Sequence, residues 1–328
     1  MEAIVIGAGN WGTAFSLYLD RLGIKTTLYE FFEEKAKRIK EKRENEIFLP
    51  GYNIPESIEI TSDIDLIRNK EFIIIALPSH TIDNITKMLS KYFNKNQIIV
   101  SLSKGIEPRT LRRVSQIIED NLKTKNIVAL SGPSIAREFV KGTPTSLVAA
   151  SRKIDIAKKV QKCFSSETLR IYTSNDIIGV ELGGSLKNVY AIAAGVIDGL
   201  GFGLNTKAAL ITRSLAEMKR LGTAMGGKTD TFNGLSGTGD LIVTAFSDFS
   251  RNHYVGRELG KGKKIENILK DMKEVAEGVN TSLSVRKLSH KYKVELPIAE
   301  EVYKVIFENE SPEVSIRRLM KRALKGED

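Results

Sequence analysis

Short apolar runs alternate with amphipathic stretches along the first half of the chain. The runs have the length and composition of buried strands and lie at residues 3–7, 26–29, 72–76, 97–102, 127–131, 145–150 and 169–172. Stretches with helical spacing lie between most of them, among them 13–22, 82–92 and 110–121. Short strands that alternate with helices predict an α/β fold with a parallel, doubly wound sheet.

The pattern changes near Ser174. From Asn175 onward the apolar positions recur with helical spacing, and we expect helices at 177–198, 206–221, 240–246, 253–259, 265–271, 281–291, 297–307 and 312–323. The sequence therefore predicts two domains, an α/β domain over residues 1–174 and an all-helical domain over residues 175–328.

A glycine-rich turn joins the first expected strand to the first expected helix. It reads Gly7-Ala8-Gly9-Asn10-Trp11-Gly12, and an acidic residue, Glu30, follows the second strand. Gly7 permits a tight turn, Gly9 leaves room for a pyrophosphate, and Gly12 lets the helix pack closely on the strand. Amide groups at the helix start would hold the phosphates. The turn predicts a Rossmann-type domain that binds a dinucleotide.

Composition narrows the class of ligand. The chain has 328 residues and a formal net charge of +10, and its basic residues are interspersed with acidic ones. We therefore expect small anionic ligands, a dinucleotide and a phosphorylated substrate, and no nucleic acid. No apolar run is long enough to span a bilayer, so we expect no integral membrane contact. A single cysteine, Cys163, allows no internal disulfide and suits a cytoplasmic protein.

A long, glycine-rich apolar helix in the second half carries one lysine, Lys187. Gly183 and Gly184 precede it by four and three positions and share its face of the helix. These glycines would either leave an open floor on which a small substrate reaches the amine or permit tight helix packing. Burial would lower the pKa of the amine, which could then exchange a proton with a carbonyl oxygen near neutral pH.

Further polar candidates follow this helix. Asp240 and Thr244 are spaced to share a helix face. Arg251 offers a planar fork of donors for a phosphate and Asn252 offers an amide, whereas Arg251 alone would suggest a surface salt bridge. Three polar segments, 77–80, 103–105 and 131–134, follow expected strands and would lie at the sheet edge where such folds bind ligands.

Taken together, the motifs of this chain resemble the NAD(P)-dependent sn-glycerol-3-phosphate dehydrogenases of the bacterial type. The resemblance covers nearly the whole chain in order. Besides the glycine turn and Thr13-Ala14, the carriers are Pro78-Ser79-His80, Lys104-Gly105, Ser131-Gly132-Pro133-Ser134, Gly183-Gly184-Ser185-Leu186-Lys187-Asn188, Gly199-Leu200-Gly201-Phe202-Gly203, Thr206-Lys207-Ala208-Ala209-Leu210, Gly237-Thr238-Gly239-Asp240-Leu241, Ser250-Arg251-Asn252 and Val275-Ala276-Glu277-Gly278.

The resemblance implies an oxidoreductase that interconverts dihydroxyacetone phosphate and sn-glycerol 3-phosphate with NAD or NADP and so supplies the backbone of phospholipids. It implies a homodimer, and no metal is expected because lysines assist the carbonyl. The catalytic residues it implies are Lys187, Lys104 and Asp240. The substrate contacts are Lys104, Gly132, Ser134, Lys187, Asp240, Ser250, Arg251 and Asn252, to which the helix spacing adds Thr244. The cofactor contacts are Gly7, Gly9, Asn10, Trp11, Gly12, Glu30, Phe31, Pro78, Lys104, Ala136, Arg251, Val275 and Glu277.

One departure from the family concerns Glu30 and Phe31. Related sequences can carry a glycine and a basic or neutral polar residue there, where an NADP 2′-phosphate would bind. Glu30 would instead accept a hydrogen bond from the ribose 2′-hydroxyl of NAD and repel a 2′-phosphate, so we expect NAD to be preferred. Basic residues nearby that could still reach a phosphate are Lys35, Lys37 and Arg38.

Other interpretations stay open at the level of sequence. A related two-domain reductase of the 3-hydroxyacid or 6-phosphogluconate type would place another acid beside Arg251. A non-catalytic NAD sensor would have no reason to combine Lys187, Asp240 and Arg251. The Tyr-x-x-x-Lys pair of short-chain dehydrogenases is missing from the sequence, and His80 suits a structural or cofactor-site role better than that of a catalytic acid.

Overall fold

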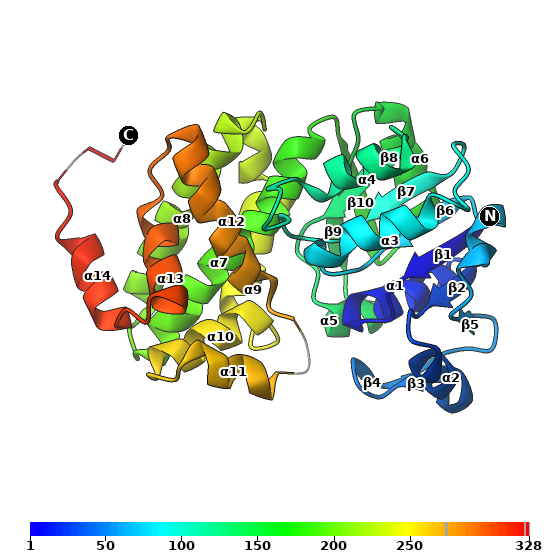
Figure 1. Ribbon diagram of the computed structural model, residues 1–328, viewed down its shortest axis with the longest axis horizontal. Coiled ribbons are helices and arrows are strands. Elements are labelled where there is room, and N and C mark those ends of the chain that lie inside the picture. The colour runs from blue at the N-terminus through cyan, green and yellow to red at the C-terminus, as the bar shows by residue number, and fades with distance from the viewer. Residues whose placement is uncertain (273–274, 325, 328) are drawn as a thin grey trace.

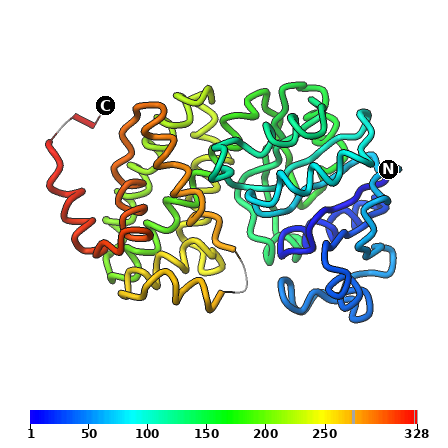
Figure 2. Tube along the Cα trace, in the orientation of Figure 1, coloured from blue at the N-terminus to red at the C-terminus, as the bar shows by residue number. Residues whose placement is uncertain are grey.

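The computed structural model describes residues 1–272, 275–324 and 326–327. An α/β part and a helical part adjoin along the long axis of the molecule (Figure 1). The trace passes once from the first part, blue to green, into the second, green to red (Figure 2). Strand β10 (Leu169–Ser174) ends the first part and helix α7 (Ile177–Gly199) begins the second. The expected division after residue 174 falls in this connection, and the independence of the two units stays a prediction.

An eight-stranded sheet forms the first part, in the order β10-β9-β8-β7-β6-β1-β2-β5. All seven expected strands are confirmed. They are β1 (Glu2–Ile6), β2 (Lys25–Tyr29), β6 (Phe72–Ile75), β7 (Ile98–Ser101), β8 (Ile127–Ser131), β9 (Thr145–Ala150) and β10. The apolar pattern did not reveal the short edge strand β5 (Glu59–Thr61) or a separate pair, β3 (Glu44–Asn45) and β4 (Leu49–Asn53).

The sheet departs from the expected parallel arrangement at one pair of strands. Strands β8 and β9 run antiparallel, while the other pairs of the large sheet are parallel. Both strands are apolar runs, and such a run shows burial but not direction. A mostly parallel, doubly wound sheet therefore describes the fold.

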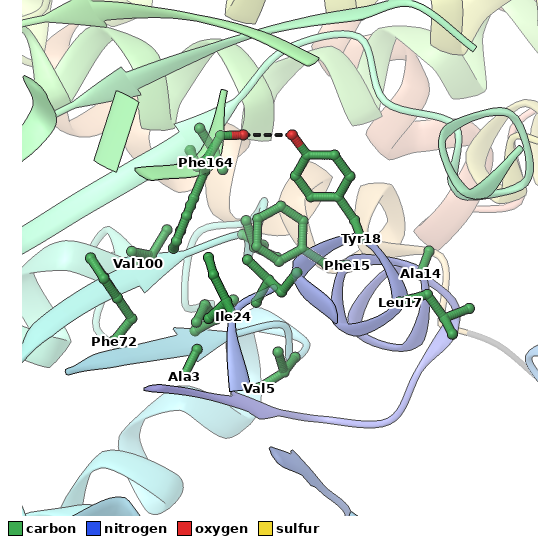
Figure 3. Close-up of a cluster of buried hydrophobic side chains, with 14 of the residues drawn as sticks. Ala3, Val5, Ala14, Phe15, Leu17, Tyr18, Ile24, Phe72, Val100 and Phe164 are labelled. Atoms are coloured by element: carbon green, nitrogen blue, oxygen red, sulfur yellow. Dashed lines mark hydrogen bonds between the residues drawn. The ribbon is translucent and has the colours of Figure 1, made fainter. Parts of the chain in front are cut away.

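Helices cover both faces of the sheet, which explains why its strands are continuous apolar runs. These helices are α1 (Asn10–Arg21), α2 (Glu33–Lys42), α3 (Ile82–Leu89), α4 (Val114–Leu122), α5 (Ala136–Val140) and α6 (Ile154–Phe164). Alternate residues of β6 enter different clusters, Phe72 and Ile74 on one face and Ile73 and Ile75 on the other. Figure 3 shows the first cluster, where the Tyr18 hydroxyl donates to the carbonyl oxygen of Phe164 over 2.6 Å.

Three short 3₁₀ helices and one π-helical turn complete the connections, at Ile64–Asn69, Ser79–Thr81, Thr229–Asn233 and Leu235–Gly239. The helix expected at 110–121 begins only at Val114. Leu111 has a φ of +59°, and Ile106 pairs with Arg113, so the preceding residues form a turn.

The second part is helical throughout the residues described. Around the buried α7 lie α8 (Leu204–Ala224), α9 (Asp240–Phe246), α10 (Arg251–Gly260), α11 (Ile265–Asp271), α12 (Glu277–Tyr292), α13 (Pro297–Phe307) and α14 (Pro312–Met320). Glycines let α7 and α10 touch backbone to backbone: a Cβ atom on Gly195 would overlap the carbonyl oxygen of His253. This contact fixes the start of α10 against α7.

Candidate active site

A cavity of about 560 Å³ lies where the two parts meet. Its walls come from the β1–α1 turn, the segments that follow β6, β7 and β8, and helices α7, α9 and α10. The β1–α1 turn and the segments after β6, β7 and β8 lie at the carboxyl ends of sheet strands, where doubly wound folds bind ligands. Residues that are far apart in the sequence therefore form one candidate site.

The β1–α1 turn has the geometry that a dinucleotide pyrophosphate requires. Gly7 has a φ of +111°, and its amide donates to the carbonyl oxygen of Tyr29 over 3.0 Å. A Cβ atom on Gly12 would overlap the carbonyl oxygen of Gly7, so close helix packing requires glycine there. A Cβ atom on Gly9 would meet nothing within 4 Å, which leaves room at the helix start.

Other expected cofactor residues lie on the same side of the cavity. Those that line it are Asn10, Trp11, Glu30, Pro78, Ala136, Val275 and Glu277. Among the described residues the buried Oδ1 of Asn10 has no hydrogen-bond partner, which leaves an acceptor for a bound group. The residues present therefore fit a dinucleotide.

Phe31 does not line the cavity, and its expected cofactor contact stays a prediction. Its ring is 60% exposed, and it is Phe32 that lines the cavity beside Lys35. The chain turns after β2 so that the Phe32 amide donates to Glu30 Oε1 over 3.2 Å. Sequence spacing does not show this turn. Gly12 also lies behind the cavity wall, where it serves helix packing.

Two lysines converge on one buried carboxylate in the cavity wall. Asp240 Oδ1 lies 3.0 Å from Lys187 Nζ, and Asp240 Oδ2 lies 2.6 Å from Lys104 Nζ. Lys187 Nζ also donates to Thr244 Oγ1 over 2.6 Å, so the expected shared helix face of Asp240 and Thr244 is present. The three expected catalytic residues thus form one hydrogen-bonded group.

Lys104 is the most exposed member of this group, at 17% of its side chain. Its ammonium donates to the carbonyl oxygen of Gly132 over 2.9 Å and to Ser134 Oγ over 3.1 Å. Gly132 therefore contacts Lys104 through its backbone and does not itself line the cavity, whereas Ser134 does. The loop after β8 holds Lys104 at the cavity wall.

The electrostatic surroundings of Lys187 shift the pKa of its amine. Burial lowers the pKa of Lys187 from 10.5 to about 8, because desolvation of the ammonium group outweighs the attraction of Asp240. The positive charges of Lys104 and Arg251 act in the same direction as burial. A pKa near neutral lets an amine donate a proton in one direction of a reaction and accept it in the other.

The glycines before Lys187 serve helix packing, and the interpretation of an open floor is wrong. A Cβ atom on Gly183 would lie 2.7 Å from the carbonyl oxygen of Ser236, and one on Gly184 would lie 2.6 Å from Ser131 Oγ. Neither glycine lines the cavity. Close contact with the π-helical turn and with β8 places Lys187 at the cavity wall instead.

The first turn of α10 carries the residues expected at the substrate phosphate. Ser250 caps the helix, with its Oγ accepting from the His253 amide over 3.2 Å, and Ser250, Arg251 and Asn252 line the cavity. The amide nitrogen of Asn252 donates to Asn188 Oδ1 over 2.9 Å, and its Oδ1 accepts from the Gly278 amide over 2.9 Å. An amide nitrogen carries two hydrogens, and Asn188 takes one of them.

Asn188 is a cavity residue to which sequence reasoning gave no role. Its Nδ2 donates to the carbonyl oxygen of Lys104 over 3.1 Å, so it connects α10 with the strand end that carries Lys104. Its position directly after Lys187 was the available signal. Arg137 and Phe249 also line the cavity, and no sequence motif pointed to either of them. The Arg137 guanidinium lies 5.4 Å from the centre of the Phe249 ring.

Glu277 joins the two parts of the chain at the cavity. Its carboxylate accepts from the Ser79 amide over 3.1 Å and from Ser79 Oγ over 2.7 Å. Burial raises the pKa of Glu277 above 4.5, although the Ser79 hydrogen bonds and the charges of His80 and Arg251 oppose the rise.

Comparison with known proteins identifies the family. The sequence profile described as "NAD-dependent glycerol-3-phosphate dehydrogenase N-terminus" matches residues 2–157, and the profile for the C-terminus of the same family matches residues 176–317. The chain belongs to this family. Glycerol-3-phosphate dehydrogenases [NAD(P)+] from Thermoanaerobacter sp. (strain X514) and Bacillus velezensis are 46% and 45% identical to it, over 100% and 98% of this chain and 99% and 94% of theirs.

Solved structures agree with the assignment to the glycerol-3-phosphate dehydrogenases. The enzyme from Coxiella burnetii superposes with a TM-score of 0.93 at 31% identity, over 98% of this chain and 99% of that one. The expected resemblance, fold class and NAD(P) dependence are thereby confirmed, and the protein is an oxidoreductase that acts on a CH–OH group. No helix in the described part of the chain is long and apolar enough to cross a membrane.

Proposed function

We propose that the protein interconverts dihydroxyacetone phosphate and sn-glycerol 3-phosphate, with Lys187 as the proton donor and acceptor. The convergence of Lys187 and Lys104 on Asp240, beside the glycine turn and inside one cavity, is the observation that supports these roles. Bound NAD(P)H would supply the hydride. The side chains described above then have to bind the substrate, orient it and move one proton.

The substrate phosphate would bind at the first turn of α10. Arg251 supplies a fork of donors, and Asn252 supplies the amide hydrogen that Asn188 does not take. Interactions with a remote phosphate can orient the reacting carbonyl, so their binding energy contributes to the rate. Ser250 holds the helix start in place.

Proton transfer would take place at Lys187 Nζ. In the reductive direction the protonated amine donates to the developing alkoxide, and in the oxidative direction the neutral amine accepts the hydroxyl proton. Asp240 and Thr244 hold the amine by two hydrogen-bonding contacts. Lys104, which is bound to the same Asp240 carboxylate, would add positive charge near the substrate oxygen and so stabilise the negative charge of the developing alkoxide.

The cofactor side of the cavity supports a preference for NADH over NADPH. Glu30 places a carboxylate at the end of β2, where the ribose 2′-hydroxyl would bind. Two of the basic residues that could have bound an NADP 2′-phosphate despite Glu30 form ion pairs with other carboxylates, Lys37 with Glu41 and Arg38 with Glu46. Lys35 lines the cavity, where its ammonium lies 4.4 Å from the centre of the Phe32 ring.

The wider setting follows from the family resemblance. The product would serve as the glycerol phosphate backbone for phospholipid synthesis, and we propose a cytoplasmic homodimer. Analytical ultracentrifugation of the purified protein tests the dimer, since a single species at the mass of one chain, 36.4 kDa, would contradict it.

The activity is tested by following oxidation of NADH, and separately of NADPH, with dihydroxyacetone phosphate as the only acceptor. We expect rapid oxidation with NADH favoured, and we expect Glu30→Gln to narrow the difference between the cofactors. Rapid oxidation with NADPH favoured would keep the reaction and refute the role of Glu30. Tight cofactor binding without oxidation of either cofactor would contradict the proposed reaction.

A further inference from the structure

A cluster of one partly exposed carboxylate, Asp198, and two buried partners, Lys207 and His253, lies beside the first turn of α10. One carboxylate oxygen, Asp198 Oδ2, is 2.6 Å from Lys207 Nζ and 2.6 Å from His253 Nε2. The side chains of Lys207 and His253 are 9% and 4% exposed. Loss of one member of a buried ion pair leaves the other uncompensated, so these three groups depend strongly on one another.

The cluster joins the helices that carry the site. Asp198 lies near the end of α7, which also carries Lys187, and Lys207 lies in the first turn of α8. The Lys207 ammonium lies 4.5 Å from the ring centre of Phe246, the last residue of α9. His253 belongs to the first turn of α10. The carboxylate thus connects α7, α8 and α10, and Lys207 extends the contact to α9.

The first turn of α10 is held against α7 at two points. The backbone of His253 contacts α7 at Gly195, where no Cβ atom fits, and its side chain contacts α7 at Asp198. Its amide donates to Ser250 Oγ, the helix cap. Arg251 and Asn252 lie between the cap and His253, so their placement depends on both contacts.

None of the three cluster residues lines the cavity. Burial raises the pKa of Asp198, but hydrogen bonds from Lys207 and His253 outweigh burial and lower that pKa below 3.8, so the carboxylate is ionised at neutral pH. The Asp198 carboxylate is 29% exposed and does not line the cavity, so it acts on the substrate through the residues it holds in place.

We propose that Asp198, with Lys207 and His253, is a positioning residue that holds Arg251 and Asn252 toward the substrate phosphate. The inference rests on the proposed function, because it assigns the phosphate to the first turn of α10. Asp198 would therefore affect substrates that carry a phosphate and leave the hydride and proton transfer to a substrate without one unchanged.

The test compares Asp198→Asn with a control variant on α10, the helix that Asp198 is proposed to position. The side chain of Glu258, near the end of α10, is 7% exposed, and it also binds two cationic groups, Lys261 over 2.8 Å and Lys263 over 2.6 Å. For wild type, Asp198→Asn and Glu258→Gln, kcat/KM is measured with dihydroxyacetone phosphate and with dihydroxyacetone, which lacks the phosphate, and Kd is measured for NADH.

We expect Asp198→Asn to lower kcat/KM for dihydroxyacetone phosphate about tenfold or more. Its kcat/KM for dihydroxyacetone and its Kd for NADH should each change by less than about twofold. Glu258→Gln should change each value by less than about twofold. Equal losses with both substrates, or no loss with either, would overturn the positioning role. A wild-type enzyme that shows no preference for the phosphorylated substrate would instead refute the proposed function.

A second pair of variants keeps the inference testable if Asp198→Asn does not fold. His253→Gln retains a donor for Asp198, and His253→Leu removes it. We expect the first to retain most of the phosphate-dependent activity and the second to reproduce the loss. Equal activity of the two variants with dihydroxyacetone phosphate would contradict the proposal.

Discussion

Replacement of Thr244 by valine tests how the site sets the protonation of Lys187. Valine keeps the shape of threonine and removes the oxygen that accepts from Lys187 Nζ over 2.6 Å. Hydrogen bonds to a charged group stabilise by about 1.5–3 kcal/mol, roughly twice the value for neutral partners. The protonated amine therefore loses about 1.4 kcal/mol more than the neutral amine, which lowers its pKa by about one unit.

The expected consequence is a change in pH dependence and not a uniform loss of rate. The pKa of Lys187 is about 8 in the wild-type protein, so Thr244→Val should lower it to about 7. At pH 6 both amines are almost fully protonated. At pH 8 about half of the wild-type amine but only about a tenth of the variant amine is protonated, so reduction should be about fivefold slower in the variant.

The assay is kcat/KM for reduction of dihydroxyacetone phosphate between pH 6 and pH 9, expressed as the ratio of variant to wild type. The matched control is Thr86→Val, because Thr86 is buried in α3, donates to the carbonyl oxygen of Ile82 over 2.6 Å and accepts from Asn121 over 2.8 Å. This control should leave the ratio constant across the range. A constant ratio for Thr244→Val would refute the reasoning.

Two further predictions concern stability. Gly195→Ala should lower the free energy of unfolding by about 1–3 kcal/mol, measured with urea, because a Cβ atom there overlaps the α10 backbone, and an unchanged midpoint would contradict the packing account. Burial raises the pKa of Glu217 from 4.5 to about 7. The folded state therefore binds more protons between these values, and stability should fall by on the order of 3 kcal/mol as the pH rises through that window. Glu217→Gln should remove this fall, and urea titrations at pH 5 and pH 7 that show the same fall in both proteins would refute it.

The alternation of apolar runs and helical spacing was sufficient to predict most of the fold. Strand β6 is four buried apolar residues with no polar face, which is what a strand covered on both sides requires. The reversed direction of β9 was beyond sequence reasoning, because direction is set by how the chain returns across the sheet. The edge strand β5 has only three residues and too short a pattern to recognise.

In the site, too, the sequence patterns identified residues but could not predict which of them make contact. Motifs identified Lys104 and Asp240 separately, but a contact between residues 136 positions apart is a property of the folded chain. The glycines before Lys187 were compatible with an open floor or with close helix packing, and only the position of Ser236 decides between them. The role of Asn188 could not be predicted, since its partners come from two other elements.

Replacement of Lys187 by methionine tests whether this amine is the proton donor of the reaction. The matched control is Lys70→Met, which removes an equally buried lysine that lies 3.0 Å from the carboxylate of Glu2, remote from the cavity. Single-turnover oxidation of NADH by dihydroxyacetone phosphate is measured together with NADH binding. The account predicts that Lys187→Met binds NADH as the wild type does and loses turnover, while Lys70→Met retains both. Turnover near the wild-type rate in Lys187→Met would contradict the assignment of Lys187 as the proton donor.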